Sequence, residues 1–331
     1  MICIENKDFV LDEHTVVTLG KFDGIHKGHR KLIHKALEIS HKTGMKSAVF
    51  TFKVTEENKF PYMESEKITT PGERKAILEE LGVDILVEYP FDTEVADTEP
   101  VDFLTDVLKN KMKAAYIVVG EDWTFGKGGR GNAQTLRSNC DKLGFEPVIL
   151  KKETYDGRKI GSSWVREEIA AGHMETVNIL LDYPYSITGV VVHGNRIGRT
   201  TGFPTAHILP GDDKILPPFG VYASKTLIDG KEYYGISNIG VKPTISDNNA
   251  VNVETNLIGY DGDLYGRSIK VELIHFRRPE MKFESVDALK NQLVRDIEFS
   301  KTLVENPFNI IVINIPHLIV ISSLTVLFTL S

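Results

Sequence analysis

A short apolar run that passes directly into a glycine-rich turn constrains the fold of this chain more than any other feature. Residues 16–19 (VVTL) are apolar enough for a buried strand, and the turn behind them carries three glycines between residues 20 and 28. Apolar residues then recur on one helix face, at Leu32, Ile33, Ala36, Leu37 and Ile39. A strand, a tight turn and a helix in this order are typical of α/β folds, whose ligands bind at the carboxyl ends of the strands.

The same alternation continues to about residue 143. Strand-like runs cover residues 47–52, 85–87 and 115–119, and helix-like runs cover residues 71–81, 101–108 and 132–143. We therefore predict a Rossmann-like α/β domain in which helices cover a parallel sheet.

From about residue 186 the pattern changes. Short β-rich runs at 187–193, 221–228, 233–239, 251–257 and 269–276 are separated by Gly, Pro, Asn and Asp, and residues 287–304 have helical spacing. This pattern predicts an antiparallel β-barrel closed by one helix. The segment 181–184 (LDYP) is the predicted boundary, which gives domains at residues 1–182 and 183–305.

Composition limits the class of protein. A chain of 331 residues, 41% of them hydrophobic, can bury two moderate cores. The formal net charge of -7 argues against a general nucleic-acid binder, which needs clustered Lys and Arg. Only Cys3 and Cys140 are present, and charges at Glu5, Lys7 and Asp8 do not suit a signal peptide. We expect a reduced, cytoplasmic protein.

The turn after the first strand contains an H-x-G-H pair, His26 and His29. Imidazoles beside the free N–H groups of a helix N-terminus suit nucleotide phosphates, and adenylyl transfer needs only positioning and charge stabilisation. Gly24 and Gly28 allow close backbone approach. One alternative is a zinc site, although no third ligand has suitable spacing. The other is that both histidines are simply solvated residues of a surface turn. The surrounding Gly-x-Phe-Asp-Gly favours phosphate binding.

This turn resembles the ATP-binding motif of the bacterial bifunctional riboflavin kinase/FMN adenylyltransferases, also called FAD synthetases. The similarity spans about residues 14–304. It implies a nucleotidyltransferase fold for the first domain, with His26 and His29 on the ATP phosphates. The residues implied to shape the nucleotide-binding turn are Gly20, Phe22, Asp23, Gly24 and Gly28.

Residues 118–126 (VVGEDWTFG) resemble the family's V-G-x-D-F-x-F-G segment. The resemblance implies flavin contacts by Asp122, Trp123 and Phe125. Residues 126–131 (GKGGRG) also match G-x-G-x-x-G, a dinucleotide-loop pattern that is weak by itself. A mobile surface loop is the alternative interpretation.

Residues 161–166 (GSSWVR) resemble the second nucleotidyltransferase signature, whose hydroxyls and arginine bind phosphates. The resemblance implies this role for Ser162, Ser163 and Arg166. Two serines before a helical run also predict an N-cap, and both roles are compatible because a capped helix N-terminus binds anions. Trp164 replaces a small hydroxyl residue of this signature. A second departure lies at residues 53–55 (KVT), which replace the family's x-Pro-His. This second departure bears on flavin placement more than on ATP binding.

Residues 189–207 resemble the riboflavin kinase signature, which ends in Gly-Phe-Pro-Thr-Ala-Asn. The resemblance implies ATP binding by Gly198, Arg199 and Thr205, with Mg²⁺ at Thr205 and position 207. Mg²⁺ prefers hard oxygen ligands, whereas His207 replaces the asparagine here. This substitution makes the kinase site the weaker half of the resemblance.

Two further residues of the second domain have implied roles. The resemblance makes Glu254 the general base that accepts the proton of the riboflavin 5'-hydroxyl. A lone glutamate in a strand would otherwise simply face solvent. Arg278 is implied to lie near the flavin, and a surface ion pair is the alternative.

The C-terminal segment does not belong to either domain pattern. No Asp, Glu, Lys or Arg follows Glu305, and residues 308–330 are dominated by Ile, Val, Leu and Phe. This run is long enough for a membrane span, although Pro316 and several polar residues interrupt it. An anchor, a strand-forming extension and a frameshift product remain alternatives. We favour a hydrophobic extension at 306–331 without catalytic function over membrane association.

The sequence thus predicts a flavin-cofactor enzyme that uses ATP and Mg²⁺ to phosphorylate riboflavin to FMN and to adenylylate FMN to FAD. The alternatives are a paralogue with mainly FMN adenylyltransferase activity and a flavin-binding regulator without turnover. Riboflavin, FMN and ATP are the expected partners, nucleic acid is not, and the oligomeric state stays open.

Overall fold

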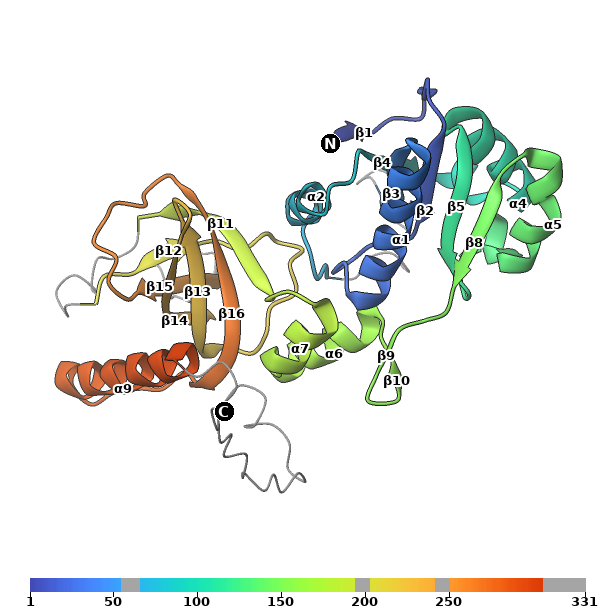
Figure 1. The fold of residues 1–331 in the computed structure, drawn as a ribbon. Helices are drawn as coiled ribbons and strands as arrows, with labels where there is room; N and C mark the ends of the chain where they lie inside the picture. Colours follow the sequence, from blue (N-terminus) through green and yellow to red (C-terminus); the bar gives the residue numbers. More distant parts are fainter. Residues whose placement is uncertain (55–65, 194–202, 242–250, 306–331) are drawn as a thin grey trace, which may run out of the picture.

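The structure is a computed structural model that describes residues 1–54, 66–193, 203–241 and 251–305 (Figure 1). The predictions for Gly198, Arg199 and the extension at 306–331 lie outside these residues. The described part consists of an α/β domain and a β-barrel, joined by two short helices.

The first domain is built on a six-stranded sheet of order β1-β4-β3-β2-β5-β8, in which all paired strands are parallel. The strands are β1 (Ile2–Ile4), β2 (Thr15–Leu19), β3 (Lys46–Val54), β4 (Ile85–Phe91), β5 (Ala114–Gly120) and β8 (Glu146–Leu150). The helices are α1 (Lys27–Thr43), α2 (Pro71–Glu80), α3 (Thr93–Ala96), α4 (Pro100–Asp102) and α5 (Ala133–Leu143), with the π-helix η3 (Phe103–Lys111). The predicted Rossmann-like α/β fold is confirmed.

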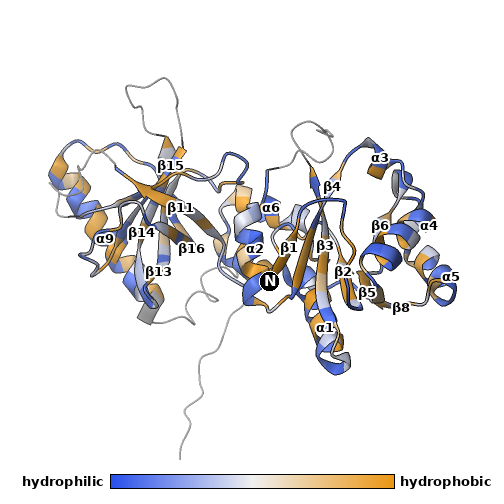
Figure 2. Ribbon diagram, turned by 90° about the horizontal axis from the view of Figure 1, so that it is seen from above, coloured by the Kyte–Doolittle hydropathy of each residue, from blue (hydrophilic) through white to orange (hydrophobic). Residues whose placement is uncertain are grey.

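Helices cover both faces of this sheet because its strands alternate their side chains (Figure 2). Val49 and Leu86 lie in one buried cluster with Ile33 of α1 and Leu78 of α2. A second cluster lies on the opposite face of the sheet. It contains the strand residues adjacent in sequence to those of the first cluster, together with apolar residues of η3 and α5. Its strand members on β3 and β4 are Ala48, Phe50, Ile85, Val87 and Tyr89.

The sequence missed two strands of the sheet, β1 and β8. β1 has only three residues, and Ile2 is largely exposed, so no run of apolar residues marks it. β8 contains Pro147 and is only half-buried at most of its positions. Both are edge strands, where partial exposure weakens the hydrophobic signal.

The second domain is a closed antiparallel barrel of order β11-β12-β15-β14-β13-β16, as predicted. Its strands are β11 (Ser186–Val192), β12 (Ala206–Ile208), β13 (Gly220–Ile228), β14 (Lys231–Val241), β15 (Val251–Leu257) and β16 (Ser268–Pro279). The predicted closing helix is α9 (Val286–Glu305), which packs on β13 and β14. The sequence missed β12 because three residues are too few for a visible alternation.

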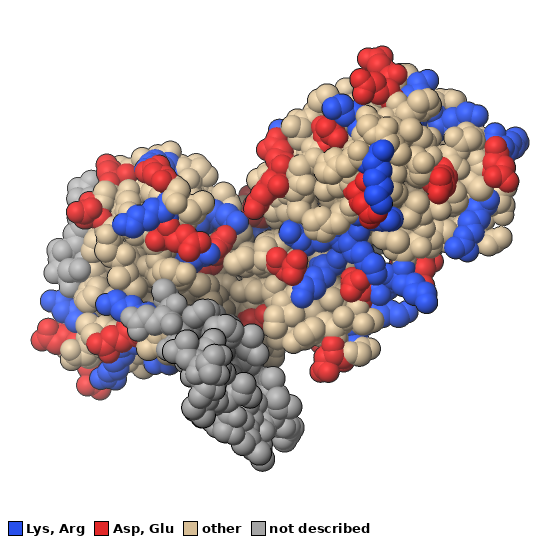
Figure 3. Space-filling view, viewed as in Figure 1, with Lys and Arg blue, Asp and Glu red and all other residues tan. Residues whose placement is uncertain are grey.

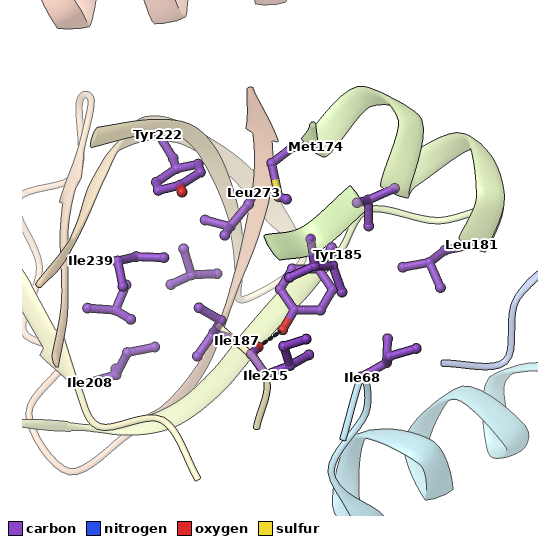
Figure 4. Close-up of a cluster of buried hydrophobic side chains, with 14 of the residues drawn as sticks. Ile68, Met174, Leu181, Tyr185, Ile187, Ile208, Ile215, Tyr222, Ile239 and Leu273 are labelled. Carbon is purple, nitrogen blue, oxygen red and sulfur yellow. Dashed lines mark hydrogen bonds between the residues drawn. The ribbon is translucent and has the colours of Figure 1, made fainter. Parts of the chain in front are cut away.

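Between the two domains lie the hairpin β9 (Thr154–Tyr155) and β10 (Arg158–Lys159), then α6 (Ser162–Ala171) and α7 (Met174–Leu181). α6, α7 and the barrel share one buried cluster, to which Ile68 of the first domain also belongs (Figure 4). The domain division after residue 182 stays a prediction.

Within the part of the chain that the structure describes, no helix is both long and apolar enough to cross a membrane.

Candidate active site

The H-x-G-H turn joins β2 to α1 and has an unusual backbone. Phe22 and Ile25 have φ angles of 47° and 35° and are fully buried, and Gly24 has φ 80°. His26 is the N-cap of α1, and its Nδ1 accepts the backbone N–H of His29 at 3.4 Å. The turn therefore places the two histidines at the positive end of a 17-residue helix.

The rings of His26 and His29 are stacked, with centroids 3.7 Å apart. Burial lowers the pKa of His26 to about 4 and holds that of His29 well below its usual range, helped by the neighbouring His26. Both rings are therefore neutral near pH 7. The Nδ1 of His29 is buried without a hydrogen-bond partner among the described residues. An orphaned polar atom of this kind is suited to a ligand oxygen.

Two glycines of the turn are required by close packing. A Cβ on Gly24 would lie 2.9 Å from the Ile68 side chain, and its φ of 80° is in any case unfavourable for other residues. A Cβ on Gly28 would come within 3.2 Å of the His26 ring. These contacts support the predicted roles of Gly24 and Gly28 as residues that shape the turn.

Three residues of the predicted phosphate site meet although 139 and 143 positions separate them. Arg166 donates to a carboxylate oxygen of Asp23 and, through Nε, to the carbonyl of Glu66 at 3.0 Å. The hydroxyl of Ser162 donates to the Asp23 carbonyl at 2.9 Å. Asp23 thus fastens the turn to α6, and its phosphate contact stays a prediction.

The predicted serine N-cap is wrong. Gly161 is the N-cap of α6, and no side chain caps this end. The Ser162 hydroxyl instead reaches back to the turn, and Ser163 is the second residue of the helix. Lys and Arg side chains gather on the surface at the start of α1 and around the β9–β10 hairpin, beside this site (Figure 3).

Trp164, which replaces a small hydroxyl residue, is buried at the start of α6. Its indole N–H donates to Glu168 at 2.7 Å, and the Arg158 guanidinium lies 4.6 Å from its ring centroid. The larger Trp164 side chain thus fits in the space between α6 and the β9–β10 hairpin.

An aromatic cavity of about 370 Å³ adjoins the turn. Trp123 and Phe125 line it, with stacked rings 4.3 Å apart, and their contact with flavin stays a prediction. Gly20 and Lys21 of the turn line the same cavity. Its other aromatic lining residues, which sequence reasoning did not propose, are Phe50, Phe52, Phe91 and Phe103.

Asp122, the third residue predicted to contact flavin, is not among the residues that line this cavity. Its carboxylate is largely exposed and pairs with Lys152 at 2.6 Å. Flavin contact by Asp122 stays a prediction.

The glycine-basic loop forms one edge of the aromatic cavity through Gly126, Gly128 and Gly129. Its cations are paired, Lys127 with Asp97 and Arg130 with Glu99. The loop lies between the short strands β6 (Thr124–Phe125) and β7 (Gly131–Asn132) and contains the 3-10 turn η4 (Lys127–Gly129). It does not join a strand to a phosphate-binding helix in the manner of a dinucleotide loop.

A second cavity, of about 410 Å³, lies at one end of the barrel. Thr205, His207 and Thr255 line it. His207 is buried, with its Nε2 3.0 Å from the Thr205 hydroxyl and its Nδ1 3.6 Å from a Glu254 oxygen. β12 pairs His207 directly with Glu254 of β15, which explains how residues 47 positions apart meet.

These residues fit a magnesium ion in part. The Thr205 hydroxyl and the Glu254 carboxylate are hard oxygen donors of the kind that Mg²⁺ prefers. The imidazole of His207 is a nitrogen donor, and it already contacts both neighbours. The fit therefore rests on Thr205 and not on His207.

Arg278 is engaged in an ion pair with Asp296 of α9. Its Nε and Nη2 lie 2.9 Å and 2.8 Å from the same carboxylate oxygen, which is fully buried. Arg278 thus forms an ion pair, but a buried one and not the surface pair of the alternative interpretation, and this pair joins α9 to β16. A flavin contact by Arg278 stays a prediction.

A parallel sheet with a histidine turn at a helix N-terminus, followed by a barrel with a cavity of its own, defines a two-site nucleotide-dependent transferase. The sequence model of FAD synthetase matches residues 9–164, and that of riboflavin kinase matches residues 181–304. The chain belongs to the family of bifunctional riboflavin kinase/FMN adenylyltransferases.

Named relatives of this family match most of the chain. The bifunctional riboflavin kinase/FMN adenylyltransferase of Listeria monocytogenes is 36% identical over 86% of this chain and 91% of its own length. Those of Bacillus subtilis and Escherichia coli are 36% and 34% identical and cover 85% and 88% of this chain, with 90% and 94% of their own lengths matched.

A solved structure has the same arrangement. A protein of Streptococcus pneumoniae described as a macrolide-efflux protein superposes with a TM-score of 0.80 at 32% identity, over 92% of this chain and 99% of its own. The similarity therefore includes both domains in one chain.

Proposed function

We propose that this protein phosphorylates riboflavin to FMN in the barrel and adenylylates FMN to FAD in the α/β domain, with ATP as co-substrate of both reactions. The observation that carries this proposal is the aromatic cavity that adjoins the H-x-G-H turn, with Gly20 and Lys21 shared between them. A planar flavin fits between aromatic rings, and its phosphate would then lie at the nucleotide site.

In the adenylyl transfer, a phosphate oxygen of FMN attacks the α-phosphorus of ATP, and the bond to pyrophosphate breaks. No side chain has to act as a covalent nucleophile. The turn would contribute neutral imidazoles and the free N–H groups at the start of α1, which stabilise the charge on the phosphates. The burial of His26 and the orphaned Nδ1 of His29 support this role.

In the kinase reaction, the riboflavin 5'-hydroxyl attacks the γ-phosphorus of ATP, and ADP leaves. Glu254 would accept the hydroxyl proton; it is not itself a lining residue of the barrel cavity, but its carboxylate lies 3.6 Å from His207, which lines that cavity. Mg²⁺, held through Thr205, would neutralise charge on the ATP phosphates when bound. His207 would orient the Thr205 hydroxyl through their 3.0 Å contact.

The relatives carry both activities in their names, which favours the bifunctional enzyme over a paralogue with mainly FMN adenylyltransferase activity and over a regulator without turnover. We also infer a cytoplasmic location, because both reactions consume ATP.

Purified protein incubated with Mg²⁺ and ATP, and with either riboflavin or FMN, tests the proposal. Chromatography of the flavins should show FMN and FAD from riboflavin, and FAD from FMN. FAD from FMN alone would leave only the adenylyltransferase, and flavin binding without any product would leave only the regulator.

A further inference from the structure

One lysine of the barrel domain is buried against the α/β domain. The side chain of Lys214 is only 2% exposed. Its ammonium donates to the carbonyl of Ile68 at 2.7 Å and to Glu73 Oε2 at 2.6 Å, and it lies 4.5 Å from the centre of the Tyr185 ring. Lys214 therefore bonds to the other domain at two separate points.

Glu73, the partner of Lys214, also contacts both domains. It belongs to the capping box of α2, in which it accepts the backbone N–H of Thr70 at 3.0 Å. Its second oxygen accepts the backbone N–H of Thr188 in β11 at 3.1 Å. The Lys214–Glu73 pair thus connects the start of α2 to two parts of the barrel.

The segment of residues 67–69, which Lys214 holds, is paired with the barrel along its backbone. The N–H of Lys67 donates to the carbonyl of Asp213 at 2.6 Å, and the N–H of Ile215 donates to the carbonyl of Lys67 at 2.9 Å. Ile68 lies in the same buried cluster as Tyr185 and Ile215 (Figure 4). The segment is therefore fixed to the barrel by both backbone and side-chain contacts.

The opposite side of this segment supports the H-x-G-H turn. The N–H groups of Ile68 and Thr69 donate to Asp23 Oδ1 at 3.0 Å and 3.2 Å. The N–H of Gly24 donates to the Thr69 hydroxyl at 3.1 Å, and the Ile68 side chain leaves no space for a Cβ on Gly24. Any shift of residues 67–69 therefore moves the turn that carries His26 and His29.

Joining two domains does not require a buried cation. The neighbouring pair Lys67–Asp213 spans the same interface with both side chains well exposed. Burying Lys214 costs desolvation, which lowers its pKa although Glu73 opposes that effect. Lys214 is not among the residues that line the aromatic cavity or the barrel cavity, and the groups that its ammonium contacts all belong to the domain interface.

We propose that Lys214, a residue of the barrel domain, is a positioning residue for adenylyl transfer in the α/β domain. It holds residues 67–69 so that Asp23 and Gly24 keep the histidine turn in place. This inference rests on the proposed adenylyltransferase function. It makes FAD formation depend on an intact contact with the kinase domain, while FMN formation does not depend on that contact.

The test uses the full-length chain with Lys214→Met, which keeps the length of the side chain and removes its charge. Lys225→Met is the matched control, because Lys225 is also an ion-paired barrel lysine but contacts Glu232 and Glu272. The double variant Glu73→Gln/Lys214→Met removes both charges and leaves no unpaired carboxylate in the interface, so it is assayed if the single variant fails to fold.

In Lys214→Met we expect kcat for FAD formation to fall about 10- to 100-fold, because small displacements of a positioned group have effects of this size. The KM for FMN should stay unchanged, since the aromatic cavity does not contact residues 67–69. The kcat for FMN formation should stay within about twofold, and Lys225→Met should leave FAD formation unchanged. Amide hydrogen exchange at Ile68 and Thr69 should accelerate in Lys214→Met alone.

Equal losses of both activities would show a merely structural role and overturn the inference, as would normal FAD formation by a folded Lys214→Met or double variant. The unsubstituted chain is assayed first. If it makes no FAD from FMN, the proposed function fails, whereas an active unsubstituted chain with an equally active Lys214→Met contradicts only the role of Lys214.

Discussion

His26 accepts the backbone N–H of His29 through its Nδ1, while the two imidazole rings stack with an interplanar angle of 16°. An Nδ1 that accepts a hydrogen bond assigns the proton of a neutral ring to Nε2. The N-cap bond therefore selects the tautomer of His26 that can donate from Nε2 to a phosphate oxygen. Stacking of two neutral rings avoids the repulsion that two imidazolium ions would have.

His29→Ala should abolish FAD formation while sparing FMN formation. Removing one preorganised donor from a phosphate site costs about 100-fold or more in kcat. Assays with FMN and with riboflavin measure the two reactions separately. The control is His34→Ala, because His34 is exposed on the same helix. Equal loss of both activities would refute independent sites.

Glu254→Ala should have the opposite effect. Loss of the general base should lower kcat for FMN formation by about 10²- to 10⁴-fold, with FAD formation from FMN retained. Glu232→Ala is the control, since Glu232 is a half-exposed strand glutamate of the same barrel that pairs with Lys225. Unchanged FMN formation in Glu254→Ala would remove Glu254 from the mechanism.

The α/β domain should lose stability as the pH falls. Burial lowers the pKa of His26 from 6.5 to about 4, so the unfolded chain binds a proton more readily than the folded chain. The contribution of His26 is complete above pH 6.5 and is lost progressively between about pH 6.5 and 4, to a total of about 3 kcal/mol.

Urea unfolding of the intact chain and of His26→Asn between pH 7 and 4.5 measures this contribution. Asn preserves an N-cap acceptor but does not titrate, so the free energy of unfolding should depend less on pH in the variant. Identical pH dependence in the two proteins would contradict a depressed pKa at His26.

Trp123→Ala should weaken FMN binding. Loss of its stacked contact in the aromatic cavity should raise the KM for FMN about fivefold, because an aromatic pair contributes about 1 kcal/mol beyond its buried area. The KM for riboflavin in the kinase reaction should not change. Trp164→Phe is the control, since Trp164 is a buried residue of α6 that packs against Arg158 and is not among the residues that line this cavity.

His207→Asn should improve the use of Mg²⁺ by the kinase. An amide oxygen replaces an imidazole next to Thr205, and Mg²⁺ prefers oxygen ligands. We expect the Mg²⁺ concentration for half-maximal FMN formation to fall about 10-fold, a typical effect of groups around a metal site. A titration of Mg²⁺ at fixed ATP measures this. An unchanged or higher requirement would show that His207 does not hinder the metal.

Much of the fold was predictable because its signals are local. A helix face repeats every few residues and a strand alternates, so β2, α1 and most barrel strands could be located from neighbouring residues alone. The histidine turn was likewise evident, since its glycines and histidines lie within ten residues. The strands β1 and β12 were missed because three residues are too few to show an alternation, and the edge strand β8 because partial burial leaves little periodic signal.

The sequence by itself therefore determined the two domain types and the H-x-G-H turn, and it predicted the signature residues of both sites. Only the tertiary structure decided which distant residues meet: four phenylalanines that line one cavity with Trp123, Arg166 on Asp23, and Lys214 on Ile68 and Glu73. The reason is physical. Periodicity is set by neighbours along the chain, whereas these contacts depend on strand order and on the docking of the barrel, to which residues far apart in sequence contribute jointly.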